Sequence, residues 1–151
     1  MPKILFICHG NICRSPMAEF LLKDMVEKRR VAEEFTIASA ATSMEEIGNP
    51  VHYGTRQKLA EFGICTAGKY ARQVTLADYQ NYDYLIVMDK NNQRNLARII
   101  GQDVDHKVSL LLDYAGRPDQ GIADPWYTGD FELTYDDIKA GLEGLLKYLG
   151  Y

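Results

Sequence analysis

Short apolar segments alternate with longer segments of helical spacing along this chain. Residues 4–8, 84–88 and 107–112 are mostly apolar, and residues 35–38 form a shorter segment of the same kind. Buried strands of a parallel sheet show near-continuous apolar runs of about this length. We therefore predict four strands at these positions.

The segments between these strands have features typical of helices. Apolar residues at positions 17, 18, 21, 22 and 25 keep helical spacing, and Pro16 suits a first helical turn. Residues 39–50 and 64–75 are predicted to be loops. Three more helices are predicted over residues 51–62 before Gly63, from a cap at Asp89 or Asn91 to residue 100 before Gly101, and from residues 131–134 to 149.

This alternation predicts the fold class. Strands that alternate with helices form an α/β fold, in which a parallel sheet is covered by helices on both faces. We expect a four-stranded sheet of this kind in a single domain that spans residues 1–151. Ligands of such sheets bind at the carboxyl ends of the strands, and Cys8 stands at such an end.

The loop between the first strand and the first helix carries the strongest chemical signal. Residues 8–16 read CHGNICRSP, in which Gly10 and Asn11 are the residue types that most readily take left-handed backbone angles. Backbone N–H groups of such a loop, together with a helix N-terminus, form an anion site. Arg14 adds a planar fork for two phosphate oxygens. The same field stabilises a thiolate at Cys8, to which Ser15 can donate a hydrogen bond, so we predict a phosphate-binding loop with a nucleophile.

The spacing alone is a weak signal. A cysteine followed six residues later by an arginine occurs by chance, but the serine after it, the strand before it and the helix behind it make an accident improbable. The alternative is a buried structural cysteine beside a serine that caps the helix.

A second candidate element is Asp124-Pro125-Trp126-Tyr127 in the long loop before the last helix. A carboxylic acid above the nucleophile can protonate the departing phenol and afterwards activate water. The alternative is a turn, because the Asp-Pro dipeptide favours turn initiation. Trp126 and Tyr127 are candidates for an aromatic wall beside a phenyl ring, or for partly buried core residues.

Composition and charge narrow the class of partner. The net charge of −4 argues against a general nucleic-acid binder. No apolar run reaches the length of a membrane span and no signal peptide precedes the first strand, so a cytoplasmic protein is expected. Three cysteines do not make a disulfide framework, and Cys8 and Cys13 have no histidine pair near them that would suggest zinc.

The sequence also resembles a known family. CHGNICRSP at residues 8–16 and DPWYTGDF at residues 124–131 are similar to motifs of the low-molecular-weight protein tyrosine phosphatases. The resemblance extends over nearly the whole chain. Further matching segments are SAATS at 39–43, IGNP at 47–50, ARQ at 71–73 and YDYLIVMD at 82–89.

The resemblance implies roles for several residues. It implies the double role of acid and base for Asp124 and a hydrogen bond between Ser39 and the loop asparagine, Asn11. It implies that Cys13 protects Cys8 by forming a disulfide after oxidation, whereas the residues alone also allow Cys13 to be a small packing residue. For Arg72 it implies a structural role.

The chain departs from the family pattern at three positions. Family members often carry a histidine, paired with the aspartate that matches Asp89, where Lys69 or Tyr70 stands. An ion pair between Lys69 and Asp89 could replace that contact, and the sequence leaves this open. Trp126 stands where tyrosine is common. His9 replaces an apolar residue, and either lines the cleft or points outward; His52 and His106 are predicted to be surface or packing residues.

We therefore expect hydrolysis of phosphotyrosine proteins or small aryl phosphates through a cysteinyl-phosphate, by a monomer that requires no metal or other cofactor and acts on neither nucleic acid nor membrane. Cys8 is the predicted nucleophile, Arg14 the phosphate clamp and Asp124 the general acid and base, with Ser39 in support. The predicted substrate-binding residues are His9, Gly10, Asn11, Ile12, Cys13, Ser15, Trp126 and Tyr127.

Two other functions are open to a chain of this kind. Thioredoxin-coupled arsenate reductases share the loop and the fold, but they need resolving cysteines farther along, and only Cys65 lies beyond the loop here. A non-catalytic phosphate-binding module is the other alternative. Such a module has no use for a cysteine opposite an arginine together with an Asp-Pro acid loop.

Overall fold

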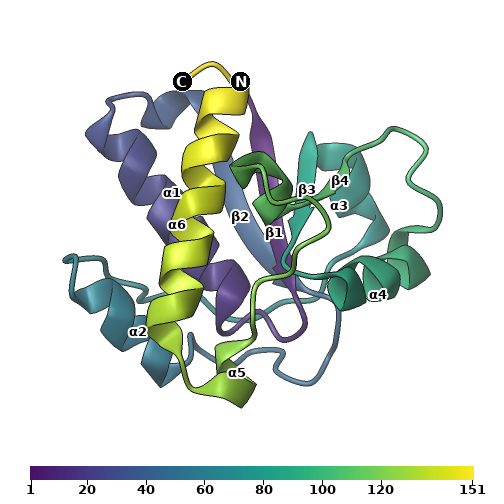
Figure 1. Cartoon of the computed structure of the whole chain (residues 1–151). Helices are drawn as coiled ribbons and strands as arrows, with labels where there is room; N and C mark the ends of the chain where they lie inside the picture. The colour runs from purple at the N-terminus through teal and green to yellow at the C-terminus, as the bar shows by residue number, and fades with distance from the viewer.

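A four-stranded parallel sheet forms the middle layer of the computed structural model, which describes residues 1–151 (Figure 1). Its order, β2-β1-β3-β4, places β1 at the centre, hydrogen-bonded to a strand on each side. The predicted fold class is therefore confirmed. The strands are β1 (Lys3–Cys8), β2 (Thr36–Ala41), β3 (Tyr84–Val87) and β4 (Val108–Leu110).

Alternate side chains of β1 supply two separate cores. Ile4 and Phe6 are fully buried in a cluster that includes residues of the first and last helices, whereas Leu5 and Ile7 are fully buried in a cluster on the opposite face of the sheet. Each such side chain contributes about 1.5–3 kcal/mol when it is removed from water. Burial on both faces explains why β1 is an uninterrupted apolar run.

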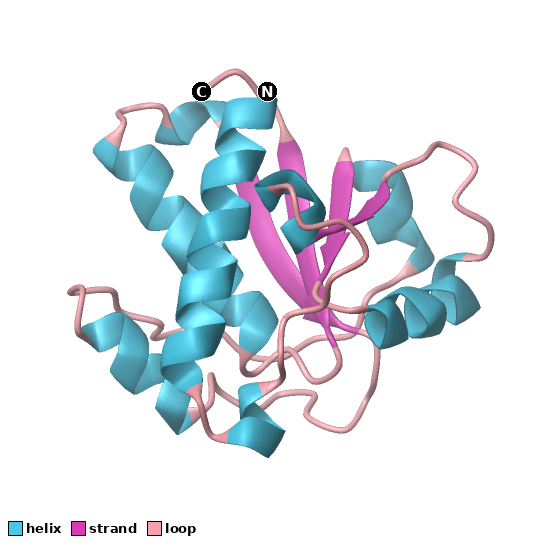
Figure 2. Cartoon of the chain, in the orientation of Figure 1, coloured by secondary structure: helices cyan, strands magenta, loops and turns pink.

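Helices cover both faces of the sheet (Figure 2). One face carries α1 (Arg14–Lys28) and α6 (Phe131–Tyr148), with α2 (Tyr53–Ala60) packed against both, and the other carries α3 (Leu76–Asn81) and α4 (Lys90–Ile100). None of these helices combines the length and the apolar character that crossing a membrane requires. The shorter helical segments are η1 (Ala32–Glu34), η2 (Leu111–Ala115) and α5 (Pro125–Thr128).

Several element boundaries differ from the prediction. The second strand extends to Ala41, so that Ser39 lies in a strand and not in the predicted loop. The predicted fourth strand stops at Leu110, where the chain turns into η2. Helix α3 was not predicted. Its N-cap is Thr75, which forms a capping box with Asp78. This short motif follows directly on an irregular stretch and was not recognised as a helix start.

The topology brings the loops after three of the strands to one end of the molecule. The carboxyl ends of β1, β2 and β3 point the same way, and the loops after them gather at the lower end of Figure 2. The N- and C-termini lie at the opposite end (Figure 1). β1 and β3 are neighbours at the point where the order of the strands reverses, which is where ligands of open α/β sheets bind.

Candidate active site

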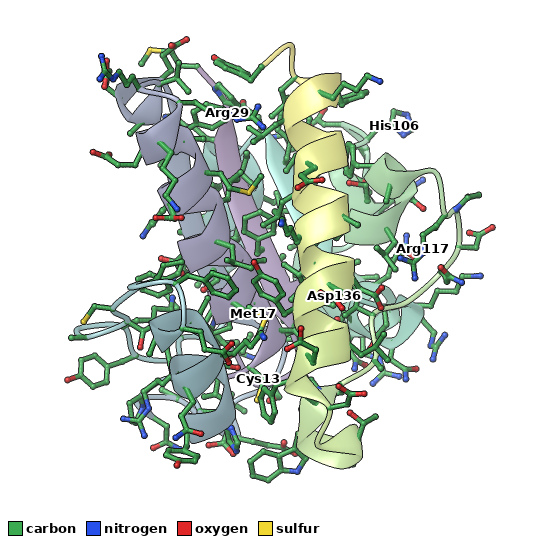
Figure 3. The ribbon with its side chains drawn as sticks, turned by 60° about the vertical axis from the view of Figure 1, so that its left-hand side comes forward. Cys13, Met17, Arg29, His106, Arg117 and Asp136 are labelled. Carbon is green, nitrogen blue, oxygen red and sulfur yellow. The ribbon has the colours of Figure 1, made fainter.

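The loop between β1 and α1 forms a tight turn around the end of the central strand. Asn11 has a φ of 59°, as expected for a residue type that tolerates the left-handed region, whereas Gly10 keeps a negative φ. Helix α1 begins at Arg14, two residues before Pro16. Figure 3 shows Cys13 at the lower end of the molecule, with Met17 of α1 above it and His106 near the opposite end.

The polar groups of this loop divide into two sets. Several of its carbonyl oxygens accept hydrogen bonds from donors outside the loop. In contrast, the backbone N–H groups of residues 9–13 donate to no acceptor in the chain, which is the arrangement of a nest that binds an anion. The carbonyl pairs are Cys8 with the Thr42 amide (3.0 Å), His9 with the Ser43 amide (3.0 Å), Ile12 with the His52 amide (2.8 Å) and Cys13 with the Met17 amide (3.2 Å).

The buried side chain of Asn11 braces the loop from within. Its amide nitrogen donates to the hydroxyl of Ser15 at 2.8 Å and to the hydroxyl of Ser39 at 2.9 Å. Its amide oxygen accepts from the backbone N–H of Arg72 at 3.2 Å. The guanidinium of Arg72 is itself paired with Asp78, so Arg72 has a structural role beside the loop.

A buried carboxylate continues this network away from the loop. The hydroxyl of Ser39 donates to Glu19 at 2.5 Å, and Lys23 donates to the other oxygen of Glu19 at 2.6 Å. Lys69 lies 3.4 Å from Glu19 and donates to the carbonyl oxygen of Ser39 at 2.8 Å. Burial lowers the pKa of Lys69, and attraction to Glu19 only partly offsets that shift.

Lys69 therefore does not take the place of the family histidine beside Asp89. Asp89 caps α4, accepting from the Asn92 amide at 2.7 Å, and its second oxygen accepts from Arg14 at 2.7 Å. Lys69 is directed instead to Glu19, which lies on the face of α1 toward β2. The sequence did not indicate Glu19 as the partner of Lys69. Glu19 stands inside an apolar helical pattern, where its charge was the one available signal.

Ser15 contacts the sulfur of Cys8 through two groups. Its hydroxyl oxygen lies 3.1 Å from the sulfur, and its backbone N–H donates to the sulfur at 3.4 Å. Because Asn11 already donates to that hydroxyl, the hydroxyl hydrogen is free to point at the sulfur. Both groups of Ser15 are therefore placed to donate to the sulfur.

The guanidinium of Arg14 is buried and oriented by three oxygens. One nitrogen donates to Asp89 at 2.7 Å and to the carbonyl oxygen of Ile122 at 2.9 Å, and the other lies 3.4 Å from Asp124. Burial by itself lowers the pKa of Arg14, but the charges of Cys8, Asp89 and Asp124 outweigh that effect and raise it. The cation is thus fixed in place before a ligand arrives.

Asp124 has two functions in the same structure. One of its carboxylate oxygens accepts from the backbone N–H of Trp126 at 3.1 Å and caps α5, and the other faces Arg14. The capping turn and the acid that the sequence offered as alternatives therefore do not exclude each other. The side chain of Asp124 is 24% exposed and lines the cleft beside Cys8.

One cleft collects most of the residues predicted from the sequence. Cys8, Arg14 and Asp124 line it together with two exposed aromatic residues of α5, Trp126 and Tyr127. Asn11, Ser15 and Ser39 do not line the cleft but support its floor. The other lining residues are His9, Gly10, Ile12, Cys13, Glu45 and Glu46.

Two glutamates at the cleft rim were missed by the sequence analysis. His9 lies at the rim, where its ring nitrogen is 2.7 Å from Glu45. The carboxylate of Glu46 accepts a hydrogen bond from Asn49 at 2.5 Å. The side chain of Glu46 lies so close to Gly10 that a Cβ added to this glycine would be 3.3 Å from it. Both belong to the loop after β2, whose length suggested a function without indicating which of its residues face the cleft.

Cys13 is buried and lines the same cleft as Cys8. Burial and the charges of Cys8 and Asp124 raise the pKa of the Cys13 thiol to about 12. Cys13 therefore stays a neutral thiol near pH 7, and of the two cysteines only Cys8 is in contact with Ser15.

A cysteine of the kind that acts as a nucleophile, a buried arginine and a carboxylate thus line one cleft. The chain belongs to the low molecular weight phosphotyrosine protein phosphatase family, whose family model matches residues 3–151. It is 41% identical to the low molecular weight protein-tyrosine-phosphatase YfkJ of Bacillus subtilis over 147 residues, which cover 97% of this chain and 94% of that protein.

Two further comparisons agree with this assignment. The low molecular weight phosphotyrosine protein phosphatase of Gallus gallus is 42% identical over 148 residues, covering 93% of each chain. The crystal structure of YfkJ from Bacillus subtilis superposes with a TM-score of 0.93 at 40% identity, covering 99% of this chain and 94% of the other.

The buried network predicts a large effect of a small change at Ser39. Ser39→Ala leaves the Glu19 carboxylate and the Asn11 amide buried with one partner fewer each, which we expect to lower the free energy of unfolding by about 1–3 kcal/mol. Urea unfolding followed by circular dichroism measures this. The control is Ser43→Ala, because the backbone N–H of Ser43 still binds the His9 carbonyl when the hydroxyl is lost. Equal losses in the two variants would contradict the bracing role of Ser39.

Proposed function

We propose that this chain is a protein-tyrosine phosphatase that hydrolyses phosphate monoesters of tyrosine and of small aryl alcohols through a cysteinyl-phosphate. The observation that carries the proposal is the single cleft in which the Cys8 sulfur, the buried Arg14 cation and the Asp124 carboxylate meet. Family membership supports the same reaction.

The first step transfers the phosphoryl group to the enzyme. The loop amides and Arg14 bind the phosphate oxygens and hold the negative charge that spreads over them in the transition state. The sulfur of Cys8 attacks phosphorus while the bond from phosphorus to the ester oxygen breaks. Asp124 gives its proton to that oxygen, and the phenol leaves as a neutral molecule.

The second step releases phosphate. Asp124, now a carboxylate, takes a proton from water while the water oxygen attacks phosphorus. The bond between phosphorus and sulfur breaks, and Cys8 returns as a thiolate that Ser15 stabilises. The cation of Arg14 serves in both steps, because its contact with Asp89 keeps it in place throughout.

An arsenate reductase of the same fold is less well supported. Cys65, the one cysteine beyond the loop, is exposed and does not line the cleft that contains Cys8. A non-catalytic phosphate-binding module has no use for the carboxylate of Asp124 opposite the sulfur. The cytoplasmic location, the monomeric state, and the lack of a nucleic-acid or membrane partner stay predictions from the sequence.

The nucleophile is tested by Cys8→Ser. We expect turnover of p-nitrophenyl phosphate, measured with EDTA present, to fall to background, since a serine hydroxyl is not ionised near pH 7. Phosphate should still bind, with a dissociation constant within about threefold of the wild-type value by calorimetry, because the loop amides and Arg14 are intact. Near-normal turnover in this variant, or arsenate reduction that needs added thioredoxin in the wild type, would overturn the proposal.

The acid is tested by Asp124→Asn, which keeps a side-chain oxygen to cap α5 but has no proton to give. In this variant the kcat for phenyl phosphate, which has a poor leaving group, should fall about 10²–10⁴-fold. The kcat for p-nitrophenyl phosphate should fall much less. Asp130→Asn is the control, since Asp130 caps α6 in the same manner and does not line the cleft. A loss that is equal for both substrates would show that Asp124 has only a structural role.

The protective role of Cys13 is tested by oxidation. Peroxide converts the Cys8 thiolate to a sulfenic acid, and attack by the Cys13 sulfur would form a disulfide and release water. Because the sulfenic acid is neutral, one of the charges that raise the pKa of Cys13 disappears at that moment. Wild type should then recover most activity after dithiothreitol, whereas Cys13→Ser should lose it permanently. Equal recovery would leave Cys13 a packing residue.

A further inference from the structure

His52 occupies an unusual position between the phosphate-binding loop and the aromatic side of the cleft. Its backbone N–H donates to the carbonyl oxygen of Ile12 in the loop at 2.8 Å. Its ring stacks on Phe131, with centroids 5.5 Å apart and an interplanar angle of 12°. The same ring makes an edge-to-face contact with Trp126, with centroids 5.4 Å apart and an interplanar angle of 72°. None of the catalytic steps above uses this residue.

The local sequence explains why the ring is held there. The Nδ1 atom of His52 accepts from the backbone N–H of Gly54 at 3.0 Å and caps α2, which fixes the ring orientation. A Cβ on Gly54 would overlap the Phe131 ring, so glycine at that position lets Phe131 pack against the start of α2. The His52 ring is thereby confined between its own helix and the first residue of α6.

Trp126, in contrast, belongs to an element with little support of its own. Helix α5 has only four residues, and the Trp126 residue is 56% exposed. Among aromatic rings, His52 is the one that Trp126 contacts. Trp126 also lines the cleft beside Cys8, where an aryl group attached to the bound phosphate has to pass.

We propose that His52 is a positioning residue that holds the Trp126 ring at the side of the cleft and thereby sets the affinity for the aryl group of the ligand. The part of this proposal that concerns aryl phosphates rests on the proposed function. The part that concerns the position of Trp126 does not. Edge-to-face aromatic contacts of this kind are strong enough to change an affinity about three- to tenfold.

Two substitutions separate the ring of His52 from its capping atom. His52→Asn keeps an oxygen that can accept from Gly54 but removes the ring, whereas His52→Phe keeps an aromatic ring and removes the acceptor. The ligands are benzylphosphonate, an aryl analogue that is not hydrolysed, and inorganic phosphate. We expect His52→Asn to weaken benzylphosphonate about three- to tenfold and to leave phosphate within about twofold, with His52→Phe close to wild type for both. Affinities are measured by calorimetry.

A second measurement needs no activity. Trp126 is the single tryptophan of the chain, so acrylamide quenching of tryptophan fluorescence reports its exposure alone. Quenching should increase in His52→Asn and stay near the wild-type value in His52→Phe. The matched control is His106→Asn, a histidine replaced at the opposite end of the sheet, which should change neither quenching nor affinity.

The outcomes decide between a contact through the ring and a structural role. Unchanged quenching in His52→Asn would overturn the proposal, because the ring of His52 would then not hold Trp126. Equal losses of affinity for benzylphosphonate and phosphate would also overturn it, because the effect would then not be specific to the aryl group. A double variant with Trp126→Ala should be no weaker for benzylphosphonate than Trp126→Ala alone. If wild type hydrolyses no aryl phosphate, the proposed function fails, while the quenching series still decides whether His52 positions Trp126.

Discussion

The phosphate-binding loop keeps its N–H groups free for an anion while four of its carbonyl oxygens, those of Cys8, His9, Ile12 and Cys13, are hydrogen-bonded on the outer side of the loop. Buried backbone carbonyls that lack a donor are costly, so a loop of this shape needs partners on its outer side. Donors come from the segments after β2, around the start of α2 and from α1 itself. The position of those segments in the fold is thus a condition for the anion site.

The same constraint explains the buried polar network around Asn11. A left-handed residue in a tight loop gains a fixed geometry when its side chain bonds to groups on several elements, here Ser15 of α1 and Ser39 of β2. Glu19 then satisfies the hydroxyl of Ser39, and Lys23 and Lys69 neutralise the carboxylate. A network of this kind rigidifies a site only when every member has a partner.

Local patterns were sufficient for much of the fold and for the centre of the site. The apolar run of β1 and the glycine, asparagine, arginine and serine that follow the cysteine are all contained within residues 4–16, so one window of sequence predicts the loop. Contacts between distant segments were not accessible in this way. The pairing of Arg14 with Asp89 joins positions 75 residues apart. Lys69 pairs with Glu19 and not with Asp89 because of the way α1 packs on the sheet.

The free N–H groups of residues 9–13 also make the measured stability of this protein depend on its solvent. A tetrahedral oxyanion that binds the folded loop and not the unfolded chain stabilises the fold by mass action, and the effect grows with its concentration. On the proposed function, phosphate and sulfate, both common buffer ions, would meet that description. An unfolding midpoint recorded in such a buffer therefore includes the occupancy of the loop, and stabilities of variants can be compared only at one fixed concentration of oxyanion.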